Sequence, residues 1–235
     1  MDVRTKALMD FLNGAHSVFH AVAGIEKVLL ENGYTCLQES NAWELVPGGK
    51  YYVTRGGSAV IAFQVPENPC KGFLMSASHA DRPTFKVKEN GEQVGAYTRL
   101  LVERYGGMLM APWFDRPLSI AGRVLVETEK GVESKLVDID RDLLMIPNVA
   151  IHMNRKANDG YAYNPAVDLL PLLGGKDARA SCMPFWSRKL AVSSWVTIYI
   201  SMSGKMPGCG VWRKNISLPR PSTIWSAPGA APRAS

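Results

Sequence analysis

The C-terminal part of this sequence contains no acidic residue. From Arg179 to Ser235 there is no Asp or Glu, while Lys and Arg together number eight. The whole chain has 27 basic and 21 acidic residues and a net charge of +6. Without the eight tail residues, 19 basic side chains remain against 21 acidic ones, a net charge of −2. The positive charge therefore belongs to the tail, and residues 1–178 lack the basic surplus that is typical of nucleic-acid-binding domains.

Two further absences narrow the class of protein. No apolar run is long enough to span a membrane, and residues 1–6 lack the apolar core of a secretory signal peptide, so we expect a cytoplasmic protein without a membrane partner. No Cys-x-x-Cys pair occurs among the four cysteines, which favours free thiols over a disulfide framework or a zinc knuckle: Cys36, Cys70, Cys182 and Cys209. The 235 residues, of which 46% are hydrophobic, suffice for one large domain or two small ones.

The apolar pattern predicts two helices followed mainly by strands. Helical spacing covers residues 3–13 and 17–32, and Gly33 suits the position just after the second helix. Residues 51–53 and 59–65 are predicted to form a hairpin through Gly56-Gly57, and 123–128 and 134–139 another around Lys130-Gly131. Further strands are predicted at residues 72–79 and 150–153.

The most informative stretch is His79-Ala80-Asp81. It follows the apolar residues 72–78 and precedes Arg82-Pro83, a pattern that predicts a buried strand running into a turn. Ligands of open α/β sheets bind where strands end. Neutral imidazole is a good zinc ligand, and a carboxylate two residues later lies on the same side of an extended chain and can orient the ring. The same pattern fits a structural histidine equally well.

Many further motifs surround this stretch, in a fixed order between Leu8 and Leu173. They are Asp10-Phe11-Leu12, Phe19-His20-Ala21-Val22, Ala42-Trp43-Glu44-Leu45, Pro47-Gly48-Gly49-Lys50-Tyr51-Tyr52-Val53-Thr54-Arg55, His79-Ala80-Asp81-Arg82-Pro83, Lys86-Val87-Lys88, Tyr105-Gly106-Gly107, Ala111-Pro112-Trp113-Phe114-Asp115-Arg116, Leu118-Ser119, Ala121-Gly122-Arg123, Ile146-Pro147-Asn148-Val149-Ala150-Ile151-His152-Met153-Asn154-Arg155 and Asn164-Pro165. With these motifs in this order, the sequence resembles the aspartyl aminopeptidase family of zinc metallopeptidases.

The resemblance implies an α/β fold with a peptidase-type catalytic domain that is interrupted by a β-rich lid and assembly domain. Residues 1–88 would be the N-terminal part of the catalytic domain, and 89–178 the inserted domain. The implied function is a zinc-dependent aminopeptidase that removes N-terminal, acidic residues from peptides and works as a homo-oligomer. The alternative from another class is a non-catalytic β-rich interaction module with a basic tail, whose binding to an acidic partner would weaken with salt.

The resemblance also assigns the site residues. It makes His79 a zinc ligand and Asp81 the catalytic carboxylate that orients it, as the residue pattern alone suggests. His152 is implied as a second metal ligand or a substrate contact, provided that the inserted domain folds over the site or reaches a neighbouring subunit. From its own surroundings, His152 also fits a hydrogen-bonded structural role. We expect His16 in a surface turn and His20 in a structural role, and we assign no substrate-binding residue.

The family's other ligands and its general base have no counterpart in the matching span. Because a zinc site needs three or more protein ligands as a rule, we predict that this chain is a truncated, inactive copy that binds zinc poorly. We interpret the tail after about Ala178 as out of frame and expect residues 179–235 to be disordered or poorly folded. Four of the six tryptophans lie there, which argues against an ordinary disordered extension: Trp186, Trp195, Trp212 and Trp225.

The codons support the shifted frame. In the shifted frame, each codon takes the last base of one residue's codon and the first two bases of the next. Because Met has a single codon, this frame reads Met202-Ser203 as Glu when Ser uses one of its AG codons. It reads Met206-Pro207 as Ala. Both readings agree with a family-like continuation of the sequence. A tail that binds nucleic acid by aromatic stacking is the competing interpretation, and we predict no nucleic-acid partner.

Overall fold

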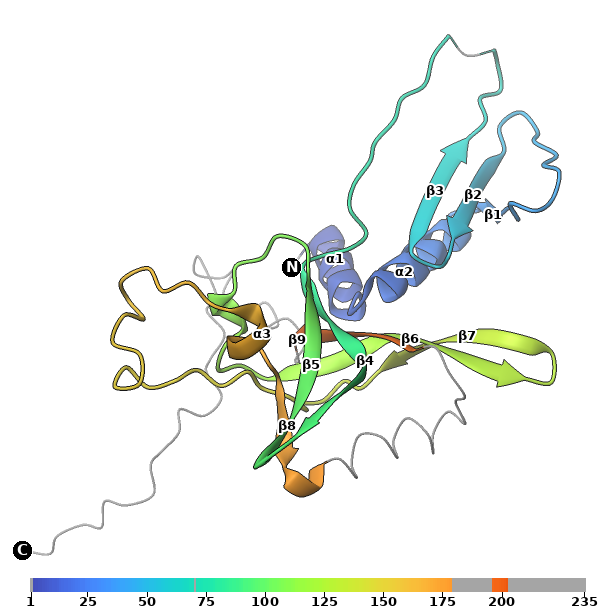
Figure 1. The fold of residues 1–235 in the computed structure, drawn as a ribbon. Helices are drawn as coiled ribbons and strands as arrows, with labels where there is room; N and C mark the ends of the chain where they lie inside the picture. The colour runs from blue at the N-terminus through green and yellow to red at the C-terminus, as the bar shows by residue number, and fades with distance from the viewer. Residues whose placement is uncertain (1, 70, 179–195, 203–235) are drawn as a thin grey trace, which may run out of the picture.

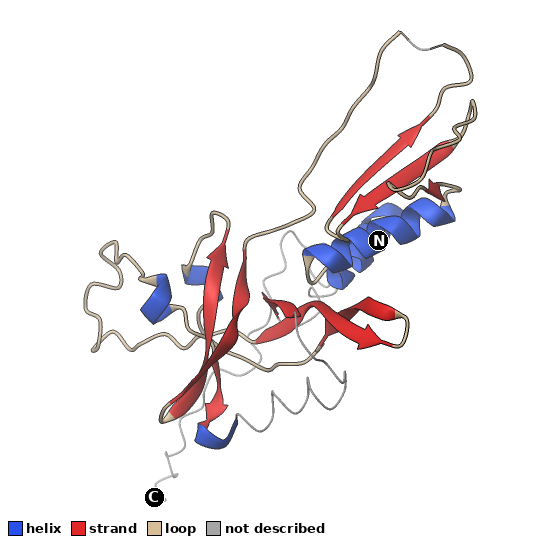
Figure 2. Ribbon diagram, turned by 45° about the vertical axis from the view of Figure 1, so that its right-hand side comes forward, coloured by secondary structure: helices blue, strands red, loops and turns tan. Residues whose placement is uncertain are grey.

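The computed structural model describes residues 2–69, 71–178 and 196–202 (Figure 1). Two helices and a three-stranded sheet form one end of the chain, a linker of residues 65–83 follows, and a six-stranded sheet forms the other end (Figures 1 and 2). This mixture of helices and sheets confirms the predicted α/β class. Within the described ranges, no helix has the length and apolar character needed to cross a membrane.

The two predicted helices are present as α1 (Val3–Gly14) and α2 (Val18–Glu31). Side-chain oxygens of Asp2 and Ser17 accept backbone N–H groups of the first turns, which are the groups that a helix leaves without intrahelical partners. Gly33, at φ 79°, ends α2: its N–H donates to the Leu30 carbonyl at 3.1 Å, and that of Tyr34 donates to the Leu29 carbonyl at 3.0 Å. This pair of bonds is a Schellman motif, which confirms the role predicted for Gly33.

The three-stranded sheet has the order β1-β2-β3, from β1 (Thr35–Cys36), β2 (Lys50–Arg55) and β3 (Ala59–Gln64). The β2–β3 hairpin is the one predicted, and Gly56 and Gly57 both adopt left-handed φ values, 60° and 66°, in its turn. Tyr51, Tyr52 and Val53 are buried. Strand β3 is an edge: within the described residues, only β2 pairs with it.

The second sheet has the order β7-β6-β9-β4-β5-β8, and every neighbouring pair is antiparallel. Its strands are β4 (Thr84–Val94), β5 (Tyr97–Tyr105), β6 (Leu118–Thr128), β7 (Gly131–Asp138), β8 (Leu172–Gly175) and β9 (Val196–Met202). The β6–β7 hairpin confirms the predicted one, because Thr128 pairs with Gly131 across Glu129 and Lys130. Short helical segments complete the chain: η1 (Ala111–Trp113), α3 (Pro165–Asp168) and η2 (Lys176–Ala178).

The main core lies beside the six-stranded sheet. Its members come from β4, β5 and β6, from η1 and from the segments that follow β7: Phe85, Leu100, Trp113, Leu118, Ile120, Ile139, Leu144, Ile146 and Leu169. Phe85 and Trp113 pack edge to face, with ring centroids 4.8 Å apart. Strand β4 crosses residue 88, so the domain boundary that we predicted there falls inside one strand.

Two strand predictions are wrong. Residues 72–79 form no strand and are exposed throughout, because no other described segment donates or accepts the backbone hydrogen bonds that a strand needs. Residues 150–153 form a turn, in which the Met153 N–H donates to the Ala150 carbonyl at 2.8 Å. In both segments the apolar pattern suggested a strand, but only tertiary pairing creates one.

Seven residues of the tail are described, and they form a strand. Strand β9 pairs with β6 on one side and with β4 on the other, so residues 196–202 are neither disordered nor unpaired. The segment Val196-Thr197-Ile198-Tyr199-Ile200 is rich in β-branched and aromatic residues, which favour strands. The other tail residues, 179–195 and 203–235, lie outside the described residues.

Candidate functional site

His79 and Asp81 contact each other at the end of the linker, directly before β4. Nδ1 of His79 lies 2.8 Å from Oδ1 of Asp81, the contact that the His-x-Asp spacing suggests. The other carboxylate oxygen, Oδ2, accepts a hydrogen bond from the hydroxyl of Tyr105. Tyr105 is placed there by the sheet, because the last residue of β5 pairs with Thr84, the first residue of β4. The carboxylate is therefore held from two sides.

This arrangement presents one ring nitrogen of His79 to solvent. With Nδ1–H donating to Asp81, the lone pair is on Nε2, for which the described part of the chain contains no partner. The His79 side chain is 90% exposed. An oriented imidazole with a free Nε2 is the form in which histidine binds zinc, so this pair can supply one ligand.

The hydrogen bond from Tyr105, followed by the one from His79, lowers the pKa of the Asp81 carboxyl below its usual value. Asp81 is therefore ionised at neutral pH and can accept the Nδ1–H. A group with a lowered folded-state pKa stabilises the fold above its unfolded-state pKa, and this stabilisation is lost as the pH falls through the folded-state value.

Replacing Tyr105 by phenylalanine tests this contact. We expect the Asp81 pKa to rise towards its ordinary value, because the substitution removes the largest cause of its lowering. The pH at which Asp81 stops stabilising the fold should rise with it. An NMR titration of the Asp81 carboxyl carbon measures the effect. Tyr97→Phe, at the exposed start of the same strand, is the matched control and should leave Asp81 unchanged. An identical Asp81 titration in Tyr105→Phe and the wild type would contradict the arrangement.

A cavity of about 310 Å³ adjoins this group. Its wall combines the α1–α2 junction, the β2–β3 turn, the end of the linker and the paired ends of β4 and β5, and includes His16, Ser17, Ser58, Asp81, Arg82 and Tyr105. Segments that are far apart in sequence thus meet at one polar hollow, next to the exposed imidazole.

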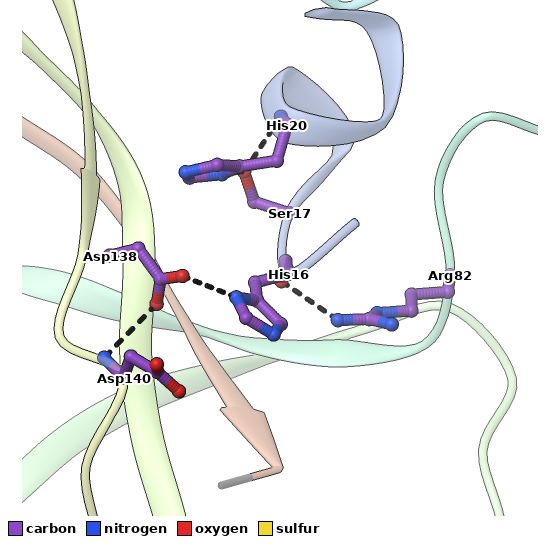
Figure 3. Close-up of polar contacts among 6 residues, drawn as sticks. All are labelled: His16, Ser17, His20, Arg82, Asp138 and Asp140. Carbon is purple, nitrogen blue, oxygen red and sulfur yellow. Dashed lines mark hydrogen bonds and ion pairs between the residues drawn. The ribbon is translucent and has the colours of Figure 1, made fainter. Parts of the chain in front are cut away.

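The junction beside this cavity is built from polar side-chain contacts (Figure 3). His16 Nδ1 donates to Oδ2 of Asp138 at 2.5 Å, and Arg82 donates from Nη2 to the His16 carbonyl at 2.8 Å. The His16 side chain is only 18% exposed, so the predicted surface turn is wrong: the residue joins the helices to the end of β7. Arg82 makes no ion pair with Asp81 in the described structure, because its guanidinium turns to His16.

His20 has the structural position that we predicted. It lies in α2, with Nδ1 2.8 Å from the hydroxyl of Ser17, the residue that caps the same helix. Burial is the main cause that lowers the pKa of His20, and the charge of Asp138 opposes it. A neutral, half-buried imidazole that bonds to its own helix cap stabilises the start of the helix.

His152 is not brought to His79. It is exposed and lies in the turn at residues 151–153. The segment of residues 147–164 and the linker lie on opposite sides of β4 and β5 in both ribbon views (Figures 1 and 2). Among the described residues, no group of three or more His, Cys, Asp or Glu side chains is arranged to hold a metal ion. The residues that the structure describes fit one zinc ligand and do not complete a site.

Sequence comparison assigns most of the chain to one protein family. Residues 11–183 match the family described as "Aminopeptidase I zinc metalloprotease (M18)". The "Probable M18 family aminopeptidase 2" of Clostridium acetobutylicum is 48% identical over 175 residues, which cover 72% of this chain and 40% of that protein. The protein of the same description from Pseudomonas putida strain GB-1 is 44% identical over 175 residues, covering 73% and 41%. The chain thus spans about two fifths of the length of these relatives and matches their N-terminal part.

Solved structures of this fold superpose on the chain. The cryo-EM structure of the Ape4 and Nbr1 complex contains a chain with a TM-score of 0.75 and 32% identity, over 85% of this chain and 44% of that one. The Chaetomium thermophilum mApe1 structure has a TM-score of 0.75 and 28% identity, over 86% and 51%. The M18 aminopeptidase of Thermotoga maritima, 18% identical, shares the fold with a TM-score of 0.71. The family predicted from the motifs is confirmed: the chain belongs to the M18 family of zinc metallopeptidases.

Proposed function

We propose that this chain is the N-terminal portion of an M18 zinc aminopeptidase and that it is catalytically incomplete by itself. The observation that carries the proposal is the held pair of His79 and Asp81, within the residues that match the family. In this proposal His79 supplies one zinc ligand through Nε2, and Asp81 fixes the ring. Zinc, when bound, polarises a scissile carbonyl and activates water. The remaining ligands would come from sequence beyond the described residues.

His152 has a separate place in the proposal. His152 is exposed, and the segment of residues 147–164 that contains it lies across β4 and β5 from the linker, which favours contact with a neighbouring subunit over contact with His79 of its own chain. We propose that the protein is a homo-oligomer in which His152 serves the partner's site as a metal ligand or a substrate contact. The structure of the yeast mApe1 dodecamer, which shares the fold at 22% identity, supports an assembly of this kind.

We propose the two domains expected from the sequence, with a different boundary between them. The described sheet favours a boundary within residues 65–83, because β4 begins at Thr84 and pairs only with strands of the β-rich region. Residues 84–178 would then form the inserted lid and assembly domain. The out-of-frame origin of residues 179–235 stays a prediction. Reading the encoding DNA past the codon of Ser235 in the alternative frame should continue family-like sequence.

A zinc titration tests the ligand assignment. We expect binding with a dissociation constant of about 1 mM, as for a single oriented imidazole, with the largest imidazole ¹⁵N shift at Nε2 of His79. The change in Nε2 chemical shift reports binding at His79 itself, and it should be the same in His152→Ala at concentrations where the chain is monomeric, while His79→Ala should remove this contribution to the zinc titration. Micromolar or tighter binding that survives His79→Ala would contradict the assignment.

A further inference from the structure

The β-rich region contains a second hollow, of about 300 Å³, which we call the aromatic recess. Its wall includes three aromatic rings and one carboxylate, those of Phe114, Tyr161, Tyr163 and Asp168. Among the described residues that line the recess, none is basic. The recess therefore combines aromatic surface with a negative charge and has no cation of its own.

The main core fixes the walls of the aromatic recess. Phe114 follows Trp113 of that core, and Asp168 precedes Leu169, which has 0% exposure. Phe114 also forms a β-bridge with Ile146, another core residue with 0% exposure. Because the wall residues are anchored to a packed core, the recess keeps its shape without a ligand, as small-molecule sites usually do.

The three rings line the recess at different angles. The ring centroids of Phe114 and Tyr163 lie 4.8 Å apart with the planes tilted by 35°. Those of Tyr161 and Tyr163 lie 5.3 Å apart with the planes almost perpendicular, at 83°. The face of an aromatic ring attracts a cation that lies within about 6 Å of its centroid, and rings at angles to one another form the cages that bind ammonium groups.

Asp168 adds a full negative charge beside these rings. Its Oδ2 accepts the backbone N–H of Asn164 at 2.7 Å and lies 3.5 Å from the Tyr161 hydroxyl. Both of these partners are neutral, and the described part of the chain supplies no partner for Oδ1. Ring packing alone would account for the aromatic residues but not for a half-buried carboxylate among them. A carboxylate with an oxygen to spare favours a cationic hydrogen-bond donor.

We propose that the aromatic recess binds a primary ammonium group, that of a lysine side chain or of a free peptide N-terminus. An anion would be repelled by Asp168 and by the ring faces. A neutral apolar ligand would remove water from the carboxylate without replacing its hydrogen bonds. An ammonium group instead donates to Oδ1 and lies against the rings. The inference goes beyond the proposed function, because neither His79 nor His152 is part of the wall of the recess.

Titration of the full 235-residue chain with small amides at neutral pH tests the proposal. N-acetyl-lysine amide carries only a side-chain ammonium group, norleucine amide carries only an α-ammonium group, and N-acetyl-norleucine amide carries neither. We expect at least one of the two amines to shift the ring proton resonances of Tyr161 and Tyr163, with a dissociation constant of about 1 mM. The amine that binds more tightly identifies the source of the ammonium group. The neutral amide should bind at least about tenfold more weakly.

Two substitutions separate the contributions of charge and ring. Asp168→Asn removes the charge but keeps an oxygen for the Asn164 N–H, and it should weaken amine binding roughly tenfold or more. Asp159→Asn is the matched control, because Asp159 is exposed in the same segment and does not line the recess. Its binding should equal that of the wild type. Tyr161→Leu should weaken binding roughly threefold or more, while Tyr161→Phe keeps the ring and should retain binding.

The unfolding midpoint of each variant is measured first, and we expect little change because Tyr161 is 40% exposed and Asn has the shape of Asp. The proposal is overturned if neither amine shifts the tyrosine resonances, or if the neutral amide binds as tightly as the amines. It is also overturned if Asp168→Asn binds as well as Asp159→Asn, or Tyr161→Leu as well as Tyr161→Phe. His79→Ala should bind the amines like the wild type, so the recess and the metal-ligand assignment can fail independently.

Discussion

Replacing Phe85 by alanine is expected to lower the free energy of unfolding by about 3–5 kcal/mol. Phe85 has 0% exposure at the start of β4 and belongs to the main core. Its ring packs on Trp113 at 4.8 Å between centroids, so the substitution removes both the buried area and the edge-to-face contact. The neighbouring side chains come from several strands and connecting segments, which limits how far they can collapse into the space left behind. Urea unfolding measures the change.

Phe73→Ala is the matched control for this prediction. It makes the same chemical change at a position that is exposed in the linker. We expect a change within about 0.5 kcal/mol of the wild type, as for surface substitutions in general. Similar losses in Phe73→Ala and Phe85→Ala would show that residues 72–79 are packed in solution, and would contradict the described linker.

The second large effect concerns catalysis. With saturating zinc, this chain is expected to hydrolyse peptides with N-terminal Asp or Glu at least about four orders of magnitude more slowly than the Clostridium acetobutylicum relative. The reason is the ligand count: the described residues offer one oriented imidazole and no group of three metal-binding side chains. Without a complete site, neither the carbonyl nor the attacking water is activated.

A chromogenic assay with Asp, Glu and Leu substrates measures this difference and the proposed acidic specificity together. The relative, assayed at the same zinc concentration, is the positive control and should prefer the two acidic substrates. Turnover by this chain within tenfold of the relative would contradict its proposed inactivity. A preference of the relative for Leu would contradict the acidic specificity and leave the ligand count untouched.

Local sequence signals predicted the parts of the fold that short-range contacts determine. At the end of α2, Gly33 donates to the carbonyl three residues earlier and Tyr34 to the carbonyl five residues earlier, and the glycines of the β2–β3 turn act within four residues. Strand β9 was missed because the tail was judged by its composition and lack of a period, while its pairing with β4 and β6 depends on partners about 75 to 115 residues away. Residues 72–78 show the converse: they have the pattern of a buried strand, but the described chain supplies no strand beside them.

The candidate site likewise combines a contact that the sequence predicted with contacts that it did not. The contact between His79 and Asp81 follows from their spacing of two, and it was predicted. Tyr105 lies 24 residues from Asp81, and the Tyr105-Gly106-Gly107 motif gave no role for its hydroxyl. Recognition of the β4–β5 hairpin would have placed it opposite Thr84 and close to Asp81. The contact of His16 with Asp138 spans 122 residues and left no local signal.

Hydrogen exchange of the amides at residues 72–79 in the free chain tests the central claim most directly. The claim is that residues 72–79, which deliver His79, have no neighbouring strand among the described residues, in line with the proposed incompleteness of the metal site. We predict exchange near the rate of an unstructured peptide at these amides, alongside strong protection in β6, which has strands on both sides. Protection of residues 72–79 equal to that of β6 would contradict the account.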